Sequence, residues 1–75
     1  MGYKRKLNKK KTGEKIYRAI EKSGLTYEEV AEELGLSSPR VIYEWTNGNK
    51  FPSLVRLVNL SLLLNVQMEG LLEVE

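Results

Sequence analysis

The stretch that decides the fold is residues 25–48, LTYEEVAEELGLSSPRVIYEWTNG. Thr26 can cap a helix, and Glu29, three residues later, completes a capping box in which each side chain accepts a hydrogen bond from the backbone N–H of the other residue. Gly35 predicts the end of this helix. The apolar positions between the cap and the glycine recur at helical spacing: Val30, Ala31 and Leu34. The pattern therefore predicts a short amphipathic helix.

A second helix, over about 38–47, is predicted to follow after a short turn. Ser38 and Pro39 read as a cap and a proline in the first turn, where the missing N–H costs nothing. Ile42 and Trp45 stand three apart and predict the buried face of this helix. Its opposite face is left to solvent, and an exposed rigid helix fits the major groove of DNA.

Outside this pair, turn and breaker residues divide residues 12–75 into five short helical segments in all. The first segment covers about 12–23, the fourth about 53–65 and the fifth about 67–73. No stretch alternates for long enough to indicate a strand. We therefore expect an all-α domain of five helices.

Composition excludes several classes of protein. The 75 residues suffice for one domain, near the lower end of the lengths that fold alone. Because they include no cysteine, histidine or aspartate, we expect no disulfide, metal site, cofactor or catalytic pair, and no small-molecule ligand is evident. No apolar run approaches the about 20 residues that span a bilayer, and the basic start lacks the apolar segment of a signal peptide. We expect a cytoplasmic protein that is not an enzyme.

Charge is divided unevenly along the chain. Residues 1–11 carry six basic groups and no acid, whereas residues 12–75 carry six basic groups against ten glutamates. The six basic residues of the first segment are Lys4, Arg5, Lys6, Lys9, Lys10 and Lys11. Since residues 1–11 have no apolar face to dock, we expect a flexible basic arm that contacts nucleic-acid phosphates. A run of this kind can equally be a solvated tail.

Four short segments together resemble the lambda repressor and Cro-like (XRE-type) helix-turn-helix family. They are residues 25–35, 45–48, 52–54 and 57–60. The resemblance covers residue 13 to about residue 73. It implies a five-helix bundle that binds double-stranded DNA as a transcriptional regulator of bacterial, phage or mobile-element origin. It also implies, as is usual in the family, a dimer on a pseudo-palindromic operator.

The resemblance assigns DNA contacts by position. The positions that match base contacts are Ser38, Pro39, Arg40, Tyr43 and Glu44. The positions that match phosphate contacts are Thr26, Tyr27, Ser37, Asn47, Asn49 and Lys50. Arg40 can donate two hydrogen bonds to guanine and Glu44 can accept one from cytosine, each discriminating between bases by about 1–3 kcal/mol. The chain departs from the family pattern by one extra residue between Gly35 and Trp45, which we place in the turn and which changes how the second helix enters the groove.

The fourth helix carries more apolar residues than one buried face needs. The family pattern assigns its core face to Leu54, Leu57, Leu60, Ser61 and Leu64. An apolar surplus then remains at Val55, Val58, Leu62 and Leu63. Because reading two half-sites needs two copies, we expect a weak homodimer. Its surface is assigned to Val55, Leu62, Leu63, Leu72 and Val74.

The alternative from another class is a protein-interaction module that keeps the fold without specific DNA binding. It is motivated by the apolar outer side of the fourth helix and by four glutamates in the helix that begins the motif. These are Glu28, Glu29, Glu32 and Glu33. Salt distinguishes the two functions, because the logarithm of a DNA-binding constant falls by roughly 0.9 per phosphate contact for each tenfold rise in salt, whereas apolar docking barely responds.

Overall fold

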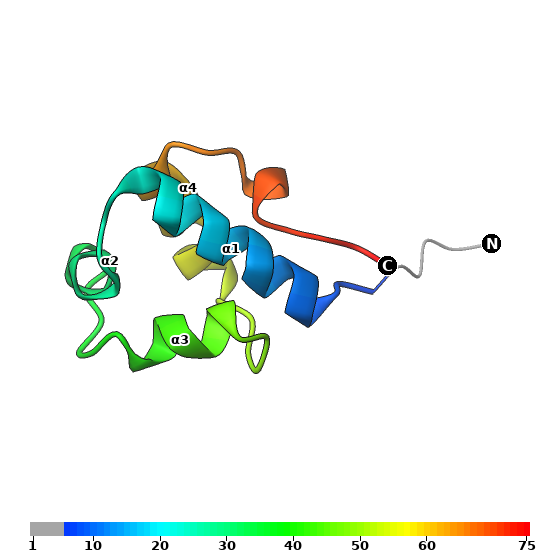
Figure 1. The fold of residues 1–75 in the computed structure, drawn as a ribbon, viewed down its shortest axis with the longest axis horizontal. Coiled ribbons are helices and arrows are strands. Elements are labelled where there is room, and N and C mark those ends of the chain that lie inside the picture. The colour runs from blue at the N-terminus through cyan, green and yellow to red at the C-terminus, as the bar shows by residue number, and fades with distance from the viewer. Residues whose placement is uncertain (1–5) are drawn as a thin grey trace.

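The computed structural model describes residues 6–75, and Figure 1 shows how the helices are arranged. The elements in chain order are α1 (Lys9–Ser23), α2 (Tyr27–Glu33), α3 (Arg40–Thr46), α4 (Leu54–Leu64) and the 3-10 helix η1 (Met68–Gly70). In Figure 1, α1 lies between α3 on one side and η1 on the other. The expected all-α class is confirmed, since extended pairing within residues 6–75 is limited to one isolated bridge between Leu7 and Val74.

The first helix begins earlier than predicted. Asn8 is its N-cap, and the Asn8 side chain accepts a hydrogen bond from the N–H of Lys11 at 2.9 Å. The boundary predicted at Thr12 is therefore wrong, because the asparagine satisfies an N–H group that a helix start leaves open. Residues 9–11 form the first turn of α1 and not part of an arm. The other end of the predicted arm, with Lys4 and Arg5, lies outside the described residues.

The fifth helix is shorter than predicted. Only Met68–Gly70 is helical, and it is a 3-10 helix in place of a helix over about 67–73. The chain then extends to reach the start of α1, where the N–H of Asn8 donates to the carbonyl of Glu73 at 2.7 Å and the N–H of Glu75 donates to the carbonyl of Lys6 at 2.8 Å. Backbone groups that pair with another segment are not available for helical hydrogen bonds, which explains the early end.

Glu73 anchors this pairing of the two ends. Its N–H donates to the hydroxyl of Thr12 at 3.0 Å, and Thr12 is buried. Its carboxylate lies 3.1 Å from Nζ of Lys15, which also donates to the carbonyl of Leu72 at 3.0 Å. We call residues 6–8 and 72–75, together with Thr12 and Lys15, the terminal clamp.

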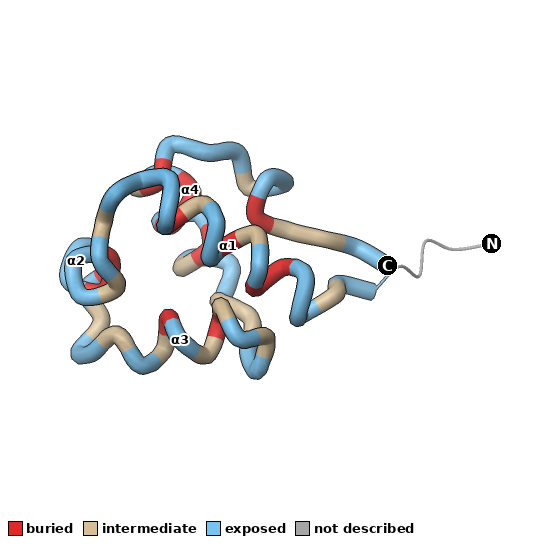
Figure 2. Tube along the Cα trace, viewed as in Figure 1, coloured by how far each residue is buried: buried red, intermediate tan, exposed pale blue. Residues whose placement is uncertain are grey.

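The core lies where the four α-helices meet Leu71, the residue that follows η1. Figure 2 shows buried stretches on all four helices, most of them facing the middle of the fold. The apolar core consists of Ile16, Ile20, Val30, Ala31, Leu34, Ile42, Trp45, Leu57, Leu60, Leu64 and Leu71. The stripes predicted for the two helices of the motif are all in this list, so the short-range pattern located them correctly.

One residue predicted for the core is exposed. Leu54 is 70% exposed, while Leu57, Leu60 and Leu64 are buried and Ser61 is buried with them. The reason is position in the helix: Leu54 is the first residue of α4, directly after its cap Ser53, and residues 53–55 at this end are all exposed. Neither α4 nor any other helix within residues 6–75 is long and apolar enough to cross a membrane.

Local signals set the ends of α2. The capping box is present: the N–H of Thr26 donates to Oε1 of Glu29 at 2.8 Å, and the N–H of Glu29 donates to Oγ1 of Thr26 at 3.0 Å. At the other end, Nη1 of Arg56 on α4 donates to the carbonyl of Leu34 at 2.6 Å. An arginine from a distant helix therefore satisfies one of the carbonyls that every helix end leaves open.

Candidate nucleic-acid interface

The turn between α2 and α3 begins at Gly35. Its φ of +72° lies in the left-handed region, which glycine adopts without strain, and the N–H of Leu36 donates back to the carbonyl of Ala31 at 2.8 Å. The helix α3 begins at Arg40, whose N–H donates to Oγ of Ser38 at 3.3 Å. It begins later than the predicted bound at residue 38, because residues 37 and 38 still belong to the bend and residue 39 is the N-cap.

The two faces of α3 are divided as predicted. Ile42 and Trp45 are buried and hold the helix on the core. On the other side Arg40 is exposed and Tyr43 is 53% exposed. The guanidinium of Arg40 has no hydrogen-bonding or charged partner within residues 6–75, so its donors are available to an external acceptor. Among the other predicted base contacts, Ser38 is exposed and Pro39 is half-buried.

Glu44 lies close to a predicted phosphate contact. Its Oε2 is 3.8 Å from Nζ of Lys50, and its backbone carbonyl accepts hydrogen bonds from the N–H groups of Asn49 and Lys50 at 3.0 and 3.2 Å. The side chain of Lys50 is well exposed and that of Glu44 about half as much. An ion pair this exposed is weak, so it brings the two groups together without removing either from contact with a ligand.

Most of the predicted phosphate contacts are accessible. Five of them are exposed: Thr26, Ser37, Asn47, Asn49 and Lys50. In the loop after α3, Oδ1 of Asn47 accepts a hydrogen bond from the N–H of Asn49 at 3.1 Å. This orientation leaves the side-chain NH2 group of Asn47 as a donor, which is the group a phosphate oxygen requires.

The sixth predicted phosphate contact, Tyr27, is half-buried and packs against α3. The ring centroids of Tyr27 and Tyr43 are 4.5 Å apart, with the ring planes tilted by 51°. Burial raises the pKa of the Tyr27 phenol, and a side-chain hydrogen bond with Thr46 offsets part of the rise. The structure therefore brings one predicted phosphate contact against one predicted base contact.

The first turn of α1 lies directly against the end of α3. A Cβ on Gly13 would be 2.5 Å from the carbonyl oxygen of Trp45, and a Cβ on Gly48 would be 2.9 Å from Cα of Lys10. Nζ of Lys9 lies 5.8 Å from the centroid of the Phe51 ring. Only glycines allow backbones this close.

Lys9 and Lys10 are therefore held beside the loop that carries Asn47, Asn49 and Lys50, although the sequence had assigned them to a flexible arm. The sequence carries one signal for this position: Gly13 stands inside a helical segment, where a glycine often marks a close contact.

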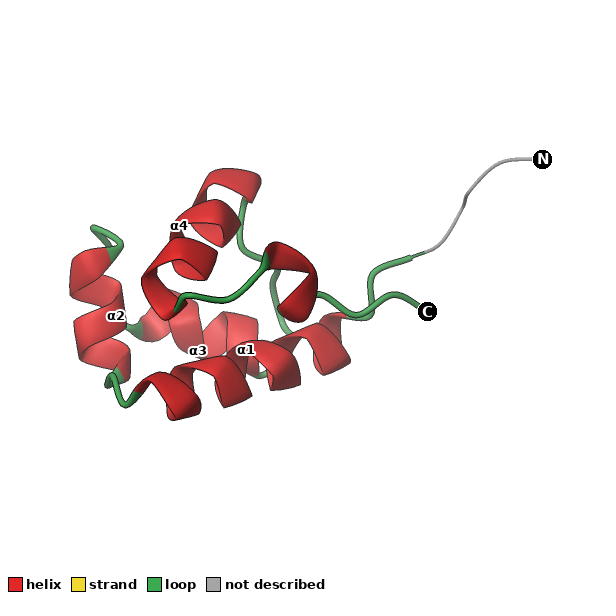
Figure 3. Cartoon of the chain, turned by 90° about the horizontal axis from the view of Figure 1, so that it is seen from above, coloured by secondary structure: helices red, strands yellow, loops and turns green. Residues whose placement is uncertain are grey.

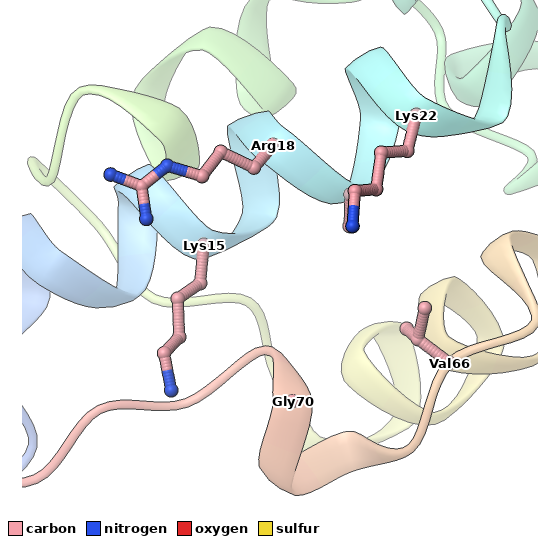
Figure 4. Close-up of a pocket in the computed structure, with 6 residues that line it drawn as sticks. Lys15, Arg18, Lys22, Val66 and Gly70 are labelled. Atoms are coloured by element: carbon pink, nitrogen blue, oxygen red, sulfur yellow. The ribbon is translucent and has the colours of Figure 1, made fainter.

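A second group of cations lies on the opposite side of α1. Lys15, Arg18 and Lys22 line a shallow groove of about 230 Å3 whose other wall includes Val66 and Gly70, as Figure 4 shows. Lys15 is engaged by the terminal clamp. Because α1 lies between α3 and η1, these cations belong to a different surface from the outer face of α3.

The residues predicted to form a dimer surface do not form one continuous surface. On α4 an apolar stripe is exposed, with Leu54 at 70%, Val55 at 68%, Val58 at 36% and Leu62 at 74%. We call these four residues the α4 stripe. The other predicted members differ: Leu63 and Leu72 are partly buried against the core, and Val74 is exposed but pairs with Leu7 at the C-terminus, which lies away from α4 in Figures 1 and 3.

Comparison with known proteins agrees with this geometry. A family model described as helix-turn-helix matches residues 16–71, which is more than half of the chain. Among solved structures, the chain is similar to the restriction-modification controller protein C.AhdI from Aeromonas hydrophila, with a TM-score of 0.73 and 24% sequence identity over 81% of this chain and 87% of that chain. At this identity the likeness concerns the fold alone. No curated protein sequence matches the chain. The chain belongs to the XRE-type helix-turn-helix family of DNA-binding regulators.

Proposed function

We propose that this protein binds double-stranded DNA in a sequence-specific manner, with α3 in the major groove, and that it regulates transcription in a bacterium, phage or mobile element. The observation that carries the proposal is the outer face of α3. Arg40 and Tyr43 are exposed there on a helix that Ile42 and Trp45 hold rigidly on the core. A rigid helix with free polar groups on its outer face is what a major groove accommodates.

Base reading falls to the outer face of α3. Arg40 presents free donors for the O6 and N7 acceptors of guanine. Glu44 accepts a hydrogen bond from cytosine, and its carboxylate lies 3.8 Å from Nζ of Lys50 without being occupied by it. Ser38 and Pro39 add base contacts at the N-terminus of α3.

Phosphate binding combines two segments that are distant in sequence. The loop after α3 supplies Asn47, Asn49 and Lys50, and the first turn of α1 supplies Lys9 and Lys10 beside it. Lysines beside α3 would set the position of this helix along the duplex, because phosphate contacts position a protein without reading sequence. Thr26 and Ser37 add phosphate contacts nearer the turn between α2 and α3.

Two copies bound side by side would read two half-sites about one helical turn, roughly 34 Å, apart. The α4 stripe is the surface we assign to the contact between them, since four neighbouring aliphatic side chains are exposed there. A twofold contact uses the same patch on both copies, which a single helix face can supply. The stripe is small, so we expect weak association that DNA reinforces.

Selection of bound duplexes from a random pool tests the function, and point variants test the roles. Arg40→Ala should lose about 1–3 kcal/mol on the selected site and relax the preference at one base pair, whereas Lys50→Ala and Lys9→Ala should weaken all duplexes alike. Each lysine change should reduce the salt slope by about 0.9. Lys22→Ala is the matched control, because it removes the same charge from the other surface of α1.

Three outcomes would contradict these assignments. A pool with no enriched sequence would refute sequence-specific binding, and binding that resists salt would favour the protein-interaction module instead. An effect of Lys22→Ala equal to that of Lys9→Ala would mean that general charge, and not a docked surface, attracts the DNA.

Sedimentation of the wild type and of Leu62→Glu, each with and without a duplex of two half-sites, tests the dimer. Leu62 is 74% exposed, so the charge should leave the fold intact and abolish pairing. Val74→Glu serves as the control, since Val74 is exposed outside the α4 stripe and should leave pairing unchanged. A Leu62→Glu variant that pairs as well as the wild type would remove the α4 stripe from consideration.

A further inference from the structure

Tyr27 and Tyr43 form a ring pair that joins the first residue of α2 to the middle of α3. Their centroids are 4.5 Å apart and their planes are tilted by 51°, which is a favourable arrangement for two aromatic rings. The pair spans the turn in which we expect one residue more than the family pattern, and its ring contact joins the two helices across that turn.

The two rings are in different environments. Tyr27 is half-buried and packs against the core. Tyr43 is 53% exposed on the outer face of α3. One ring is thus part of the domain, while the other rests on it and points to solvent. The supporting ring is half-buried against the core and in contact with Tyr43, so it is poorly placed for a phosphate contact of its own.

Support of this kind matters for recognition. An exposed side chain that must adopt one rotamer on binding costs affinity, and a ring already held in that rotamer does not incur this cost. A base-edge contact also requires a fixed direction, because the groups that distinguish base pairs are a few ångströms apart in the groove. Tyr43 has such a support and Arg40, on the same face, has none within residues 6–75.

We propose that Tyr27 is a positioning residue for DNA recognition, and that the ring of Tyr43 which it orients reads the C5-methyl group of a thymine in the major groove. This inference rests on the proposed function. The methyl group is the one apolar feature of a base edge in that groove, and a ring held in a fixed direction can cover it. Tyr43 is then a specificity-determining residue, and Tyr27 acts through it.

Replacing thymine by uracil in the selected duplex tests the proposal, because it removes only the methyl group. Scanning the thymines one by one, the wild type should lose about fourfold in affinity at one position of each half-site, the value for burying one methyl group. Tyr43→Leu should lose the fourfold preference and bind the thymine and uracil duplexes with equal affinity. Tyr27→Leu should lose the same preference although its side chain touches no base.

Two control variants separate positioning from general damage. Tyr27→Phe keeps the supporting ring and should retain the fourfold preference. Tyr17→Leu removes another half-exposed tyrosine that makes no ring pair with Tyr43, and it should also retain the preference. A merely structural role for Tyr27 would lower affinity for thymine and uracil duplexes equally.

A measurement on the free wild type covers the case in which Tyr27→Leu does not fold. Side-chain NMR couplings of Tyr43 should report one χ1 rotamer, and averaging over several rotamers would overturn the proposal. A Tyr27→Leu variant that keeps the fourfold preference would also overturn the proposal. The same holds if the wild type recognises its site but no thymine-to-uracil replacement lowers its affinity. A wild type that prefers no duplex at all would instead refute the proposed function.

Discussion

Replacing Gly13 with alanine tests the closest helix contact in the fold. The new Cβ would lie 2.5 Å from the carbonyl oxygen of Trp45 and 2.7 Å from that of Thr46, where ordinary contact begins at about 3.4 Å, so α1 and α3 would have to separate by about 0.9 Å. Both clashing atoms are backbone, which no rotamer change can move. Overpacking of this kind costs up to about 3 kcal/mol. Alanine returns about 1 kcal/mol through its higher helix propensity, which leaves a net loss of about 2 kcal/mol.

Thermal unfolding followed by circular dichroism measures this loss. At about 4–8 °C per kcal/mol for a domain of this size, the midpoint should fall by about 8–16 °C. Gly70→Ala is the control, because a Cβ there meets nothing within 4 Å, and its midpoint should stay close to that of the wild type. If Gly13→Ala unfolds at or above the wild-type temperature, helix propensity has prevailed and α1 does not approach α3 so closely.

Three further changes probe contacts made by other side chains. Thr12→Val should lower the free energy of unfolding by about 1–3 kcal/mol, because the N–H of Glu73 loses its acceptor, and urea titration should show Thr12→Ser to be closer to the wild type. Arg56→Met should cost about 1–3 kcal/mol in the same titration, since the carbonyl of Leu34 loses its charged donor. Burial raises the pKa of Tyr27, so above about pH 10 the unfolded chain releases this proton first and stability should fall. Tyr27→Phe should lack this component, and parallel pH profiles for the two proteins would contradict the assignment.

The elements that the sequence predicted well depend on neighbours in the chain. The capping box of Thr26 and Glu29, and the spacing of Ile42 and Trp45, involve residues three apart, so the information needed is local. The end of η1 depends on a distant partner, because it follows from backbone pairing between Asn8 and Glu73, which no local pattern encodes. The start of α1 was missed although its signal is local, since the side chain of Asn8 caps the helix by accepting from the N–H of Lys11.

The same division applies to the candidate site. The outer face of α3 could be predicted, because a buried stripe at Ile42 and Trp45 fixes which side is left exposed. The lysines beside that face could not, because their position follows from a contact between Gly13 and the end of α3. The ring pair of Tyr27 and Tyr43 likewise depends on how two helices cross and not on the spacing within either of them.

The terminal clamp has a consequence for how the domain can be rebuilt. Because Lys6 and Glu75 are joined by a backbone hydrogen bond of 2.8 Å, these two residues lie side by side at one corner of the fold. A short peptide could link them into a closed ring without disturbing a helix, and ring closure would stabilise the protein by removing conformations from the unfolded chain alone. A second domain fused after Glu75 would likewise start beside the basic first turn of α1, so its own charge would attract or repel the duplex there.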